Sequence, residues 1–229
     1  MIFENLTIVT IGKSDDVDLL NTYNSILPVL NLGAKWILVI KQGDITEYKG
    51  IYLKIIGQDS GLYNALNLGM EAVDTGFFMF LHSGDRIFNI DGFTSSLDLL
   101  KNNSVGCVLG GAEIDLRKHH SYSWKPYMLK FYVQPPHLPI IYRTSSVQKL
   151  KFDESVKIVS DYYFLYSYFI EEKNSYIQSS QSYIRMNLGG ATTSGLSSIF
   201  RVTRSFYQKD GIIAYLKLPF RLFIKILIQ

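Results

Sequence analysis

The sequence is poor in cysteine, and this limits what the protein can contain. Cys107 is the only cysteine among 229 residues, so the chain cannot form an internal disulfide. That is compatible with a reducing cytoplasm, where we expect the protein to be. A zinc site is not indicated, because His119 and His120 are adjacent and no cysteine lies near them. Cys107 itself lies in an apolar run and is predicted to be a core residue.

Long apolar runs and a strong net charge are also missing. No uncharged stretch reaches the roughly 18 apolar residues of a spanning helix, and we expect none. No basic leader precedes an apolar segment, so we expect no signal peptide. The net charge is +3, and residues 200–229 hold six basic residues against Asp210. The other residues hold 17 basic and 19 acidic groups, which argues against a nucleic-acid partner.

What the sequence does contain is a regular alternation of apolar strands and amphipathic helices. Hydrophobic residues make up 47% of the chain, which is typical of a folded globule. Short connections between alternating strands and helices predict an α/β fold with a mainly parallel sheet covered on both faces. Strands are predicted over residues 5–11, 35–40, 51–56 and 77–81. One helix is predicted to begin at Val17 and to be ended by Pro28, and a second helix is predicted over 62–73.

The second half continues the α/β pattern less regularly. Residues 97–100 belong to a predicted helix, and 113–136 to a tyrosine-rich hairpin and loop. Ser160 is predicted to cap a helix over 161–173. The predicted strands are 107–112, 140–142 and 182–187. We therefore expect one α/β domain, residues 1–199, followed by a C-terminal extension, residues 200–229.

Asp85 is the first candidate site residue. It follows the apolar strand 77–81, which places it at the carboxyl edge of the sheet, where open α/β folds bind ligands. A plain turn aspartate is one interpretation. The other is a ligand of Mg²⁺ or Mn²⁺ that carries diphosphate oxygens and neutralises a leaving group. His82, three residues earlier, either points into the sheet or lines the site.

The segment before this strand offers three more candidates for binding a donor. Asp59 and Gly61 precede the helix that begins near Leu62, and a glycine there permits a positive φ or a close approach of backbone to ligand. An ordinary helix-entry turn is the alternative. Asn67 is unusual inside an apolar helix, since asparagine is a mediocre helix former. It either holds a loop by hydrogen bonds or reaches the ligand.

Three further positions could carry chemistry in the second half. Asp161 opens an aromatic helix, where it either complements the helix dipole or acts as a general base on an acceptor hydroxyl. His137 follows two prolines and either contacts a phosphate or an acceptor, or stacks on tyrosines. Gly189 and Gly190 form a small loop whose backbone amides could meet a phosphate, although a plain loop is the alternative.

Taken in order, these motifs resemble the inverting family 2 glycosyltransferases with a GT-A fold, closest to their bacterial exopolysaccharide (colanic-acid-type) branch. The resemblance covers roughly residues 5–195. It rests on DSGLYNALNLG from Asp59, which is similar to D-x-G-I-Y-D-A-M-N-x-G, and on the turn Ser83-Gly84-Asp85. It also rests on the Pro136-His137 segment with the strand after it, on Ser160-Asp161-Tyr162, and on the glycine-pair loop MNLGGATT.

The resemblance implies a function and a role for each residue. The chain would transfer a sugar from a nucleoside diphosphate donor to a hydroxyl with inversion, with Asp161 as the base. Asp85 would hold the metal and diphosphate, and Asp59 would lie in the nucleotide pocket. His137 and the Gly189-Gly190 loop would lie near the donor phosphates or the acceptor. The acceptor would be a lipid-linked glycan of a bacterial surface polysaccharide.

Two departures from the family pattern keep a second hypothesis open. The acid expected after the second strand is replaced by KQGD, in which Asp44 could substitute for it, and His82 and Gly84 stand where acids are common. The alternative function is therefore a non-catalytic nucleotide-sugar-binding or scaffold protein of a membrane-associated assembly. A nucleotidyltransferase is disfavoured, because Gly12-Lys13-Ser14 is too short for its glycine-rich basic loop.

The C-terminal segment 211–229 carries a separate signal. Lys217, Arg221 and Lys225 recur every four residues among leucine, isoleucine and phenylalanine. A basic amphipathic helix of this kind fits an anionic membrane surface. We therefore expect a peripheral protein on the inner face of the cytoplasmic membrane. A helix docked on the core or in a homodimer is the alternative.

Overall fold

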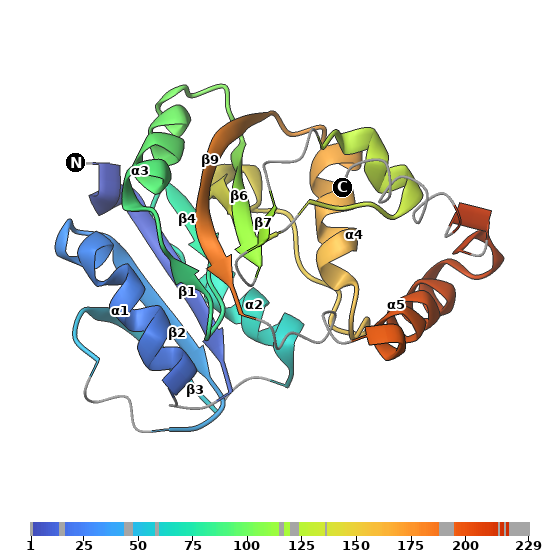
Figure 1. The fold of residues 1–229 in the computed structure, drawn as a ribbon, viewed down its shortest axis with the longest axis horizontal. Helices are drawn as coiled ribbons and strands as arrows, with labels where there is room; N and C mark the ends of the chain where they lie inside the picture. Colours follow the sequence, from blue (N-terminus) through green and yellow to red (C-terminus); the bar gives the residue numbers. More distant parts are fainter. Residues whose placement is uncertain are drawn as a thin grey trace.

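The computed structural model is an α/β fold built around one central sheet (Figure 1). It describes residues 2–13, 17–43, 48–57, 60–114, 117–119, 124–135, 137–187, 195–214, 216–217 and 219. The first half alternates strands and helices as predicted. Its elements are β1 (Leu6–Gly12), α1 (Val17–Asn31), β2 (Lys35–Ile40), β3 (Ile51–Ile56), α2 (Leu62–Glu71) and β4 (Phe77–Phe80).

The second half adds strands of 2 to 11 residues and three α-helices. A 3-10 helix over Pro126–Phe131 lies within the tyrosine-rich region, after a hairpin of β6 and β7. One π-helical turn, Ser167–Glu171, continues α4. The elements are β5 (Arg86–Ile87), α3 (Ile90–Asp98), β6 (Cys107–Ile114), β7 (Arg117–His119), β8 (Ile140–Arg143), α4 (Ser160–Tyr166), β9 (Tyr176–Met186) and α5 (Gly195–Asp210).

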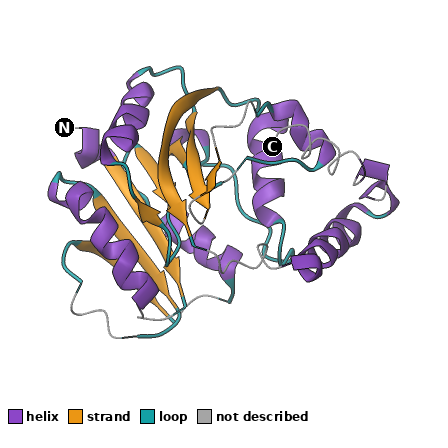
Figure 2. Cartoon of the chain, in the orientation of Figure 1, coloured by secondary structure: helices purple, strands orange, loops and turns teal. Residues whose placement is uncertain are grey.

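The sheet has the order β3-β2-β1-β4-β8-β6-β9-β5, with β7 paired to β6. The first four strands run parallel, as do β6 and β9, while β8, β5 and β7 run antiparallel to their neighbours. Figure 2 shows the strands gathered in the middle with helices on both sides. The predicted α/β class with a mainly parallel sheet is confirmed.

The buried strands explain why this sheet forms. All six residues of β1 from Leu6 to Ile11 are buried, and Trp36 to Ile40 of β2 are buried as well. Strands covered on both faces read as continuous apolar runs rather than as alternating ones. Because β1 to β4 run in the same direction, their carboxyl ends meet at one edge, and the residues that follow them are brought together there.

Three sequence predictions were wrong in detail. Pro28 does not end α1, which runs on to Asn31 because the buried neighbours Ile26 and Val29 keep this segment packed. Ser160 does not cap α4, because Val159 is the N-cap residue and the Ser160 hydroxyl is buried without a partner among the described residues. The last strand begins at Tyr176 rather than at residue 182, since its first part pairs with β6.

Helix α5 packs against the body of the protein, on the side where α4 lies (Figure 1). Phe206 is 2% exposed and stacks on Tyr132 with a centroid distance of 4.2 Å. The Tyr132 hydroxyl donates to Asp210 at 2.6 Å, and Lys217 lies 5.4 Å from the Tyr132 ring. The predicted boundary between residues 199 and 200 thus falls inside α5.

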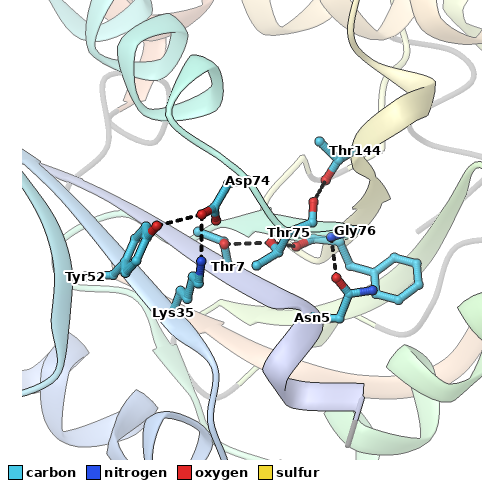
Figure 3. Close-up of polar contacts among 9 residues, drawn as sticks. Asn5, Thr7, Lys35, Tyr52, Asp74, Thr75, Gly76 and Thr144 are labelled. Carbon is cyan, nitrogen blue, oxygen red and sulfur yellow. Dashed lines mark hydrogen bonds and ion pairs between the residues drawn. The ribbon is translucent and has the colours of Figure 1, made fainter.

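Polar contacts join the amino ends of the parallel strands (Figure 3). Thr75, in the loop before β4, bonds to the Thr7 hydroxyl of β1 at 2.7 Å, and its carbonyl accepts from Thr144 at 2.7 Å. Asp74 of the same loop accepts from Lys35 and from Tyr52, each at 2.6 Å. These contacts hold the amino ends of the parallel strands together, at the edge opposite their carboxyl ends.

Candidate functional site

Asp85 lies in the turn at the carboxyl edge of the sheet, where the sequence predicted it. Gly84 has a φ of 96°, which favours glycine, and a Cβ there would lie 2.9 Å from the Asn187 side chain. Thr22 of α1 fixes the turn, because its hydroxyl donates to the Asp85 carbonyl at 2.8 Å and accepts from the Gly84 amide at 2.9 Å. The Asp85 carboxylate is therefore held on a rigid turn.

The Asp85 carboxyl is buried, and this sets its chemistry. It is 6% exposed, and its Oδ1 accepts from the Asn187 amide at 2.9 Å. The pKa of Asp85 is raised to about 7, because burial, the largest cause, and repulsion by Asp18 outweigh the lowering by backbone hydrogen bonds from Asn187 and His82. A carboxyl in this state gains from any cation that enters beside it, since the cation stabilises its charged form.

Asp161 lies in the first turn of α4 and collects hydrogen-bond donors from two other segments. Gln134 donates to its Oδ2 at 2.7 Å, and the buried Tyr63 of α2 donates to its Oδ1 at 3.3 Å. The His137 Nδ1 lies 3.7 Å from Oδ2. The side chain keeps 16% exposure, so it is partly open to solvent while its orientation is restrained.

A pair of histidines joins the Asp85 turn to Asp161. The Nε2 atoms of His82 and His137 are 3.2 Å apart. The His82 carbonyl accepts from the Asp85 amide at 3.0 Å, while His137 faces Asp161 on its other side. Burial lowers the pKa of His82 to about 3, with His137 as the second cause, and burial also lowers the pKa of His137. Both imidazoles are therefore neutral near pH 7.

Two predicted donor-site residues lie near this region with different surroundings. Gly61 is the N-cap residue of α2 with a φ of 151°, and no atom lies within 4 Å of a Cβ built on it. Asn67 is 4% exposed, and its amide bonds to both the backbone N–H and the carbonyl of Phe152 at 2.8 and 3.0 Å. It also donates to Glu154 at 2.9 Å. The alternative in which Asn67 holds a loop accounts for these contacts.

The other predicted donor-site residues lie outside the described residues. They are Asp44, Asp59, Gly189 and Gly190. Their roles stay predictions.

Three residues of the site were missed or left undecided by sequence reasoning. Gln134 was missed, and its only signal is its place in QPPH beside His137. Asn187 was missed because its backbone, not its side chain, contacts Asp85. His82 was left open, and the structure turns it toward His137 rather than into the sheet alone.

The described residues offer few ligands for a metal ion. They contain no group of three histidine, cysteine, aspartate or glutamate side chains that could hold an ion. Asp85 and Asp18, which repel each other, are the carboxylates at the turn. Mg²⁺ is usually held by one or two carboxylates plus substrate phosphates and waters. This donor set thus fits a cation that arrives with a diphosphate, and it does not form a site without one.

Comparison with known proteins shows the fold. No family model and no curated protein match this sequence. Among solved structures, Staphylococcus aureus TarS 1–349 in complex with UDP matches with a TM-score of 0.66 at 14% identity, over 95% of this chain and 70% of that one. Its complex with UDP-GlcNAc matches with a TM-score of 0.64 at 12% identity, over 95% and 71%.

The likeness to TarS is one of fold rather than of sequence. The described chain shares the fold of TarS, an α/β architecture of the GT-A-like kind. This chain spans 63% of another TarS 1–349 structure and 38% of a longer TarS structure. No helix of the described residues is long and apolar enough to cross a membrane.

Proposed function

We propose that this protein is an inverting glycosyltransferase that moves a sugar from a nucleoside diphosphate donor to a hydroxyl. One observation carries this proposal: a partly open carboxylate, Asp161, is joined through His137 and His82 to the acidic turn of Asp85. In a GT-A-like fold, that arrangement supports a base and a leaving-group site at the same edge of the sheet. The ordered motifs further support the exopolysaccharide branch of family 2.

The proposed step uses these residues in sequence. Asp161 takes the proton of the acceptor hydroxyl, and the oxygen attacks the anomeric carbon from the side opposite the diphosphate. The bond from that carbon to the phosphate oxygen breaks, and the nucleoside diphosphate leaves with the electron pair. The Asp85 turn is the proposed site at which this developing charge would be stabilised.

A divalent cation, Mg²⁺ or Mn²⁺, is the proposed cofactor. When bound, it would neutralise charge on the departing diphosphate. Asp85 would hold it, with diphosphate oxygens and waters completing the coordination. The raised pKa of Asp85, about 7, supports this role, because a buried carboxyl gains most from a neighbouring cation. Because Asp85 alone would be the protein ligand, the affinity for the cation without the donor would be weak.

The donor is proposed to carry uridine, on the ground that TarS binds UDP and UDP-GlcNAc with a similar fold. The test is calorimetric titration of the full chain with UDP, GDP and dTDP, each with and without Mn²⁺. We expect UDP to bind more tightly than GDP or dTDP, and to bind more tightly with Mn²⁺ than without it. Release of the diphosphate from the matching sugar donors is then measured with a lipid-diphosphate-linked monosaccharide as acceptor.

The outcomes separate the two functions under consideration. Turnover with a suitable acceptor supports the transferase. Nucleotide binding without turnover of any donor contradicts it and favours the non-catalytic binding protein. Failure to bind any of the nucleotides contradicts both.

The lipid-linked acceptor and the membrane surface form a separate part of the proposal. The described end of the extension exposes Ile212, Ile213 and Leu216 beside the basic residues Lys209 and Lys217. Apolar and basic side chains together suit an anionic bilayer surface. Removal of residues 211–229 should release the protein from phosphatidylglycerol vesicles in sedimentation. Unchanged sedimentation of the truncated chain would contradict membrane binding through this segment.

A further inference from the structure

We infer that Gln134 and His137 are positioning residues that hold the Asp161 carboxylate by its Oδ2 oxygen, Gln134 through a hydrogen bond and His137 through a longer electrostatic contact, and leave Oδ1 as the oxygen that takes the proton. This inference rests on the proposed function and names the atom that performs its chemical step. Neither residue is expected to touch the transferred proton. Their role is to fix which of two equivalent carboxylate oxygens faces the acceptor.

The hydrogen bonds at Asp161 are unequal. Gln134 donates to Oδ2 at 2.7 Å, a short bond, and His137 Nδ1 lies 3.7 Å from the same atom. Oδ1 has the Tyr63 hydroxyl at 3.3 Å, which is long for an O–H···O bond. A carboxylate oxygen has room for two donors. Oδ2 has the shorter hydrogen bond, and Oδ1, with one long hydrogen bond, keeps a lone pair for an acceptor hydroxyl.

The contact with Asp161 also fixes the tautomers of both histidines. A carboxylate oxygen faces His137 Nδ1, which favours the proton on that nitrogen and leaves Nε2 as an acceptor. His82 Nε2, at 3.2 Å, must then be the donor. His82 Nδ1 is consequently the unprotonated nitrogen, and it is buried without a hydrogen-bond partner among the described residues.

The loop that carries Gln134 and His137 is anchored at its start. Tyr132 has a φ of 59°, is 2% exposed and is stacked under Phe206 of α5. The indole of Trp124 donates to the Val133 carbonyl at 3.2 Å. The residue before Gln134 is thus fixed by a buried side chain and a backbone contact. Such anchoring is what a residue needs in order to orient another side chain within a fraction of an ångström.

The kinetic test uses Gln134→Met, which keeps the side-chain length and removes the donor. With the donor sugar that the wild type turns over, we expect kcat to fall about 10- to 100-fold, the size of effect that a misplaced catalytic group produces, while the donor KM changes by less than about twofold. Gln181→Met, on the exposed part of β9, is the matched control and should keep the wild-type rate. Wild-type kcat in Gln134→Met would overturn the inference while leaving the proposed function intact.

The His137 variants supply a rescue that a merely structural role would not show. His137→Asn keeps an N–H near the position of Nδ1, whereas His137→Phe keeps only a ring. We expect His137→Asn to retain most of the activity that His137→Phe loses. Equal kcat values in the two variants would count against a positioning role for His137. A wild type that turns over no donor would instead remove the proposed function and this inference together.

The tautomers provide a readout that does not depend on activity. The ring nitrogens of the four histidines can be observed by ¹⁵N NMR of the full chain near pH 7. The signals of His82 and His137 are assigned by their loss in His82→Asn and His137→Asn. We expect protonated Nδ1 in His137 and protonated Nε2 in His82. A proton on Nε2 of His137 would contradict the inferred arrangement.

Discussion

The burial of Asp85 makes the pH dependence of stability a direct test of the site. Asp85→Asn keeps the shape of the side chain and an oxygen that accepts from the Asn187 amide, but it cannot ionise. The folded wild type holds the Asp85 proton up to a pKa of about 7, whereas the unfolded chain releases it near 3.8. Between these values the native state binds more protons, so wild-type stability falls as the pH rises.

The magnitude follows from the two pKa values. Each pH unit between 3.8 and about 7 is worth about 1.4 kcal/mol, which gives a maximum of about 4 kcal/mol. The free energy of unfolding of Asp85→Asn minus that of the wild type should therefore increase from pH 4 to pH 7 and level off above it. Taking the difference between variants cancels contributions common to both proteins, such as those of the two buried histidines.

The assay is urea unfolding followed by circular dichroism at half-unit steps from pH 4 to pH 8, with EDTA present. Asp74→Asn is the control of opposite sign. Asp74 is hydrogen-bonded to Lys35 and to Tyr52, which lowers its pKa, so its loss should destabilise the protein above the ordinary aspartate pKa. If the difference in free energy of unfolding between Asp85→Asn and the wild type stays constant from pH 4 to pH 8, the raised pKa of the buried Asp85 carboxyl is refuted.

Two further predictions concern packing around the site. Phe206→Ala should lower the free energy of unfolding by about 3 to 5 kcal/mol, because it empties the space between α5 and Tyr132. Urea unfolding measures this loss. A loss below about 1 kcal/mol would mean that α5 is not firmly docked. Asn67→Ala should cost about 2 kcal/mol or more, since it leaves the backbone N–H and carbonyl of Phe152 without partners. An unchanged midpoint with lowered nucleotide affinity would instead assign Asn67 to the donor site.

The central strands of the sheet could be predicted from the sequence because they are apolar on both faces. β1 and β2 are continuous β-branched and apolar runs, and the turn residues after them are polar, so the positions of these strands along the chain and their carboxyl ends follow from the pattern. The same reasoning placed Asp85 at the carboxyl edge. Local signals were sufficient because they depend only on neighbouring residues.

The contacts that turn single residues into a site depend on distant segments and could not be predicted in this way. Gln134 reaches Asp161 only because Tyr132 adopts a positive φ under α5, and no pattern near Gln134 encodes that packing. The failed prediction for Ser160 has a similar cause. Local preference favoured a cap, but α4 begins at Ser160 itself, and its buried hydroxyl makes no hydrogen bond among the described residues.

The measurement that tests the central claim most directly is the rate of sugar transfer by Asp161→Asn at saturating donor. We predict that kcat falls about 10²- to 10⁴-fold, the usual contribution of a general base, while the affinity for the nucleoside diphosphate stays at the wild-type value. Asp153→Asn, an acid that pairs with Lys209 away from the donor turn, is the matched control. Transfer by Asp161→Asn at the wild-type rate would contradict the account.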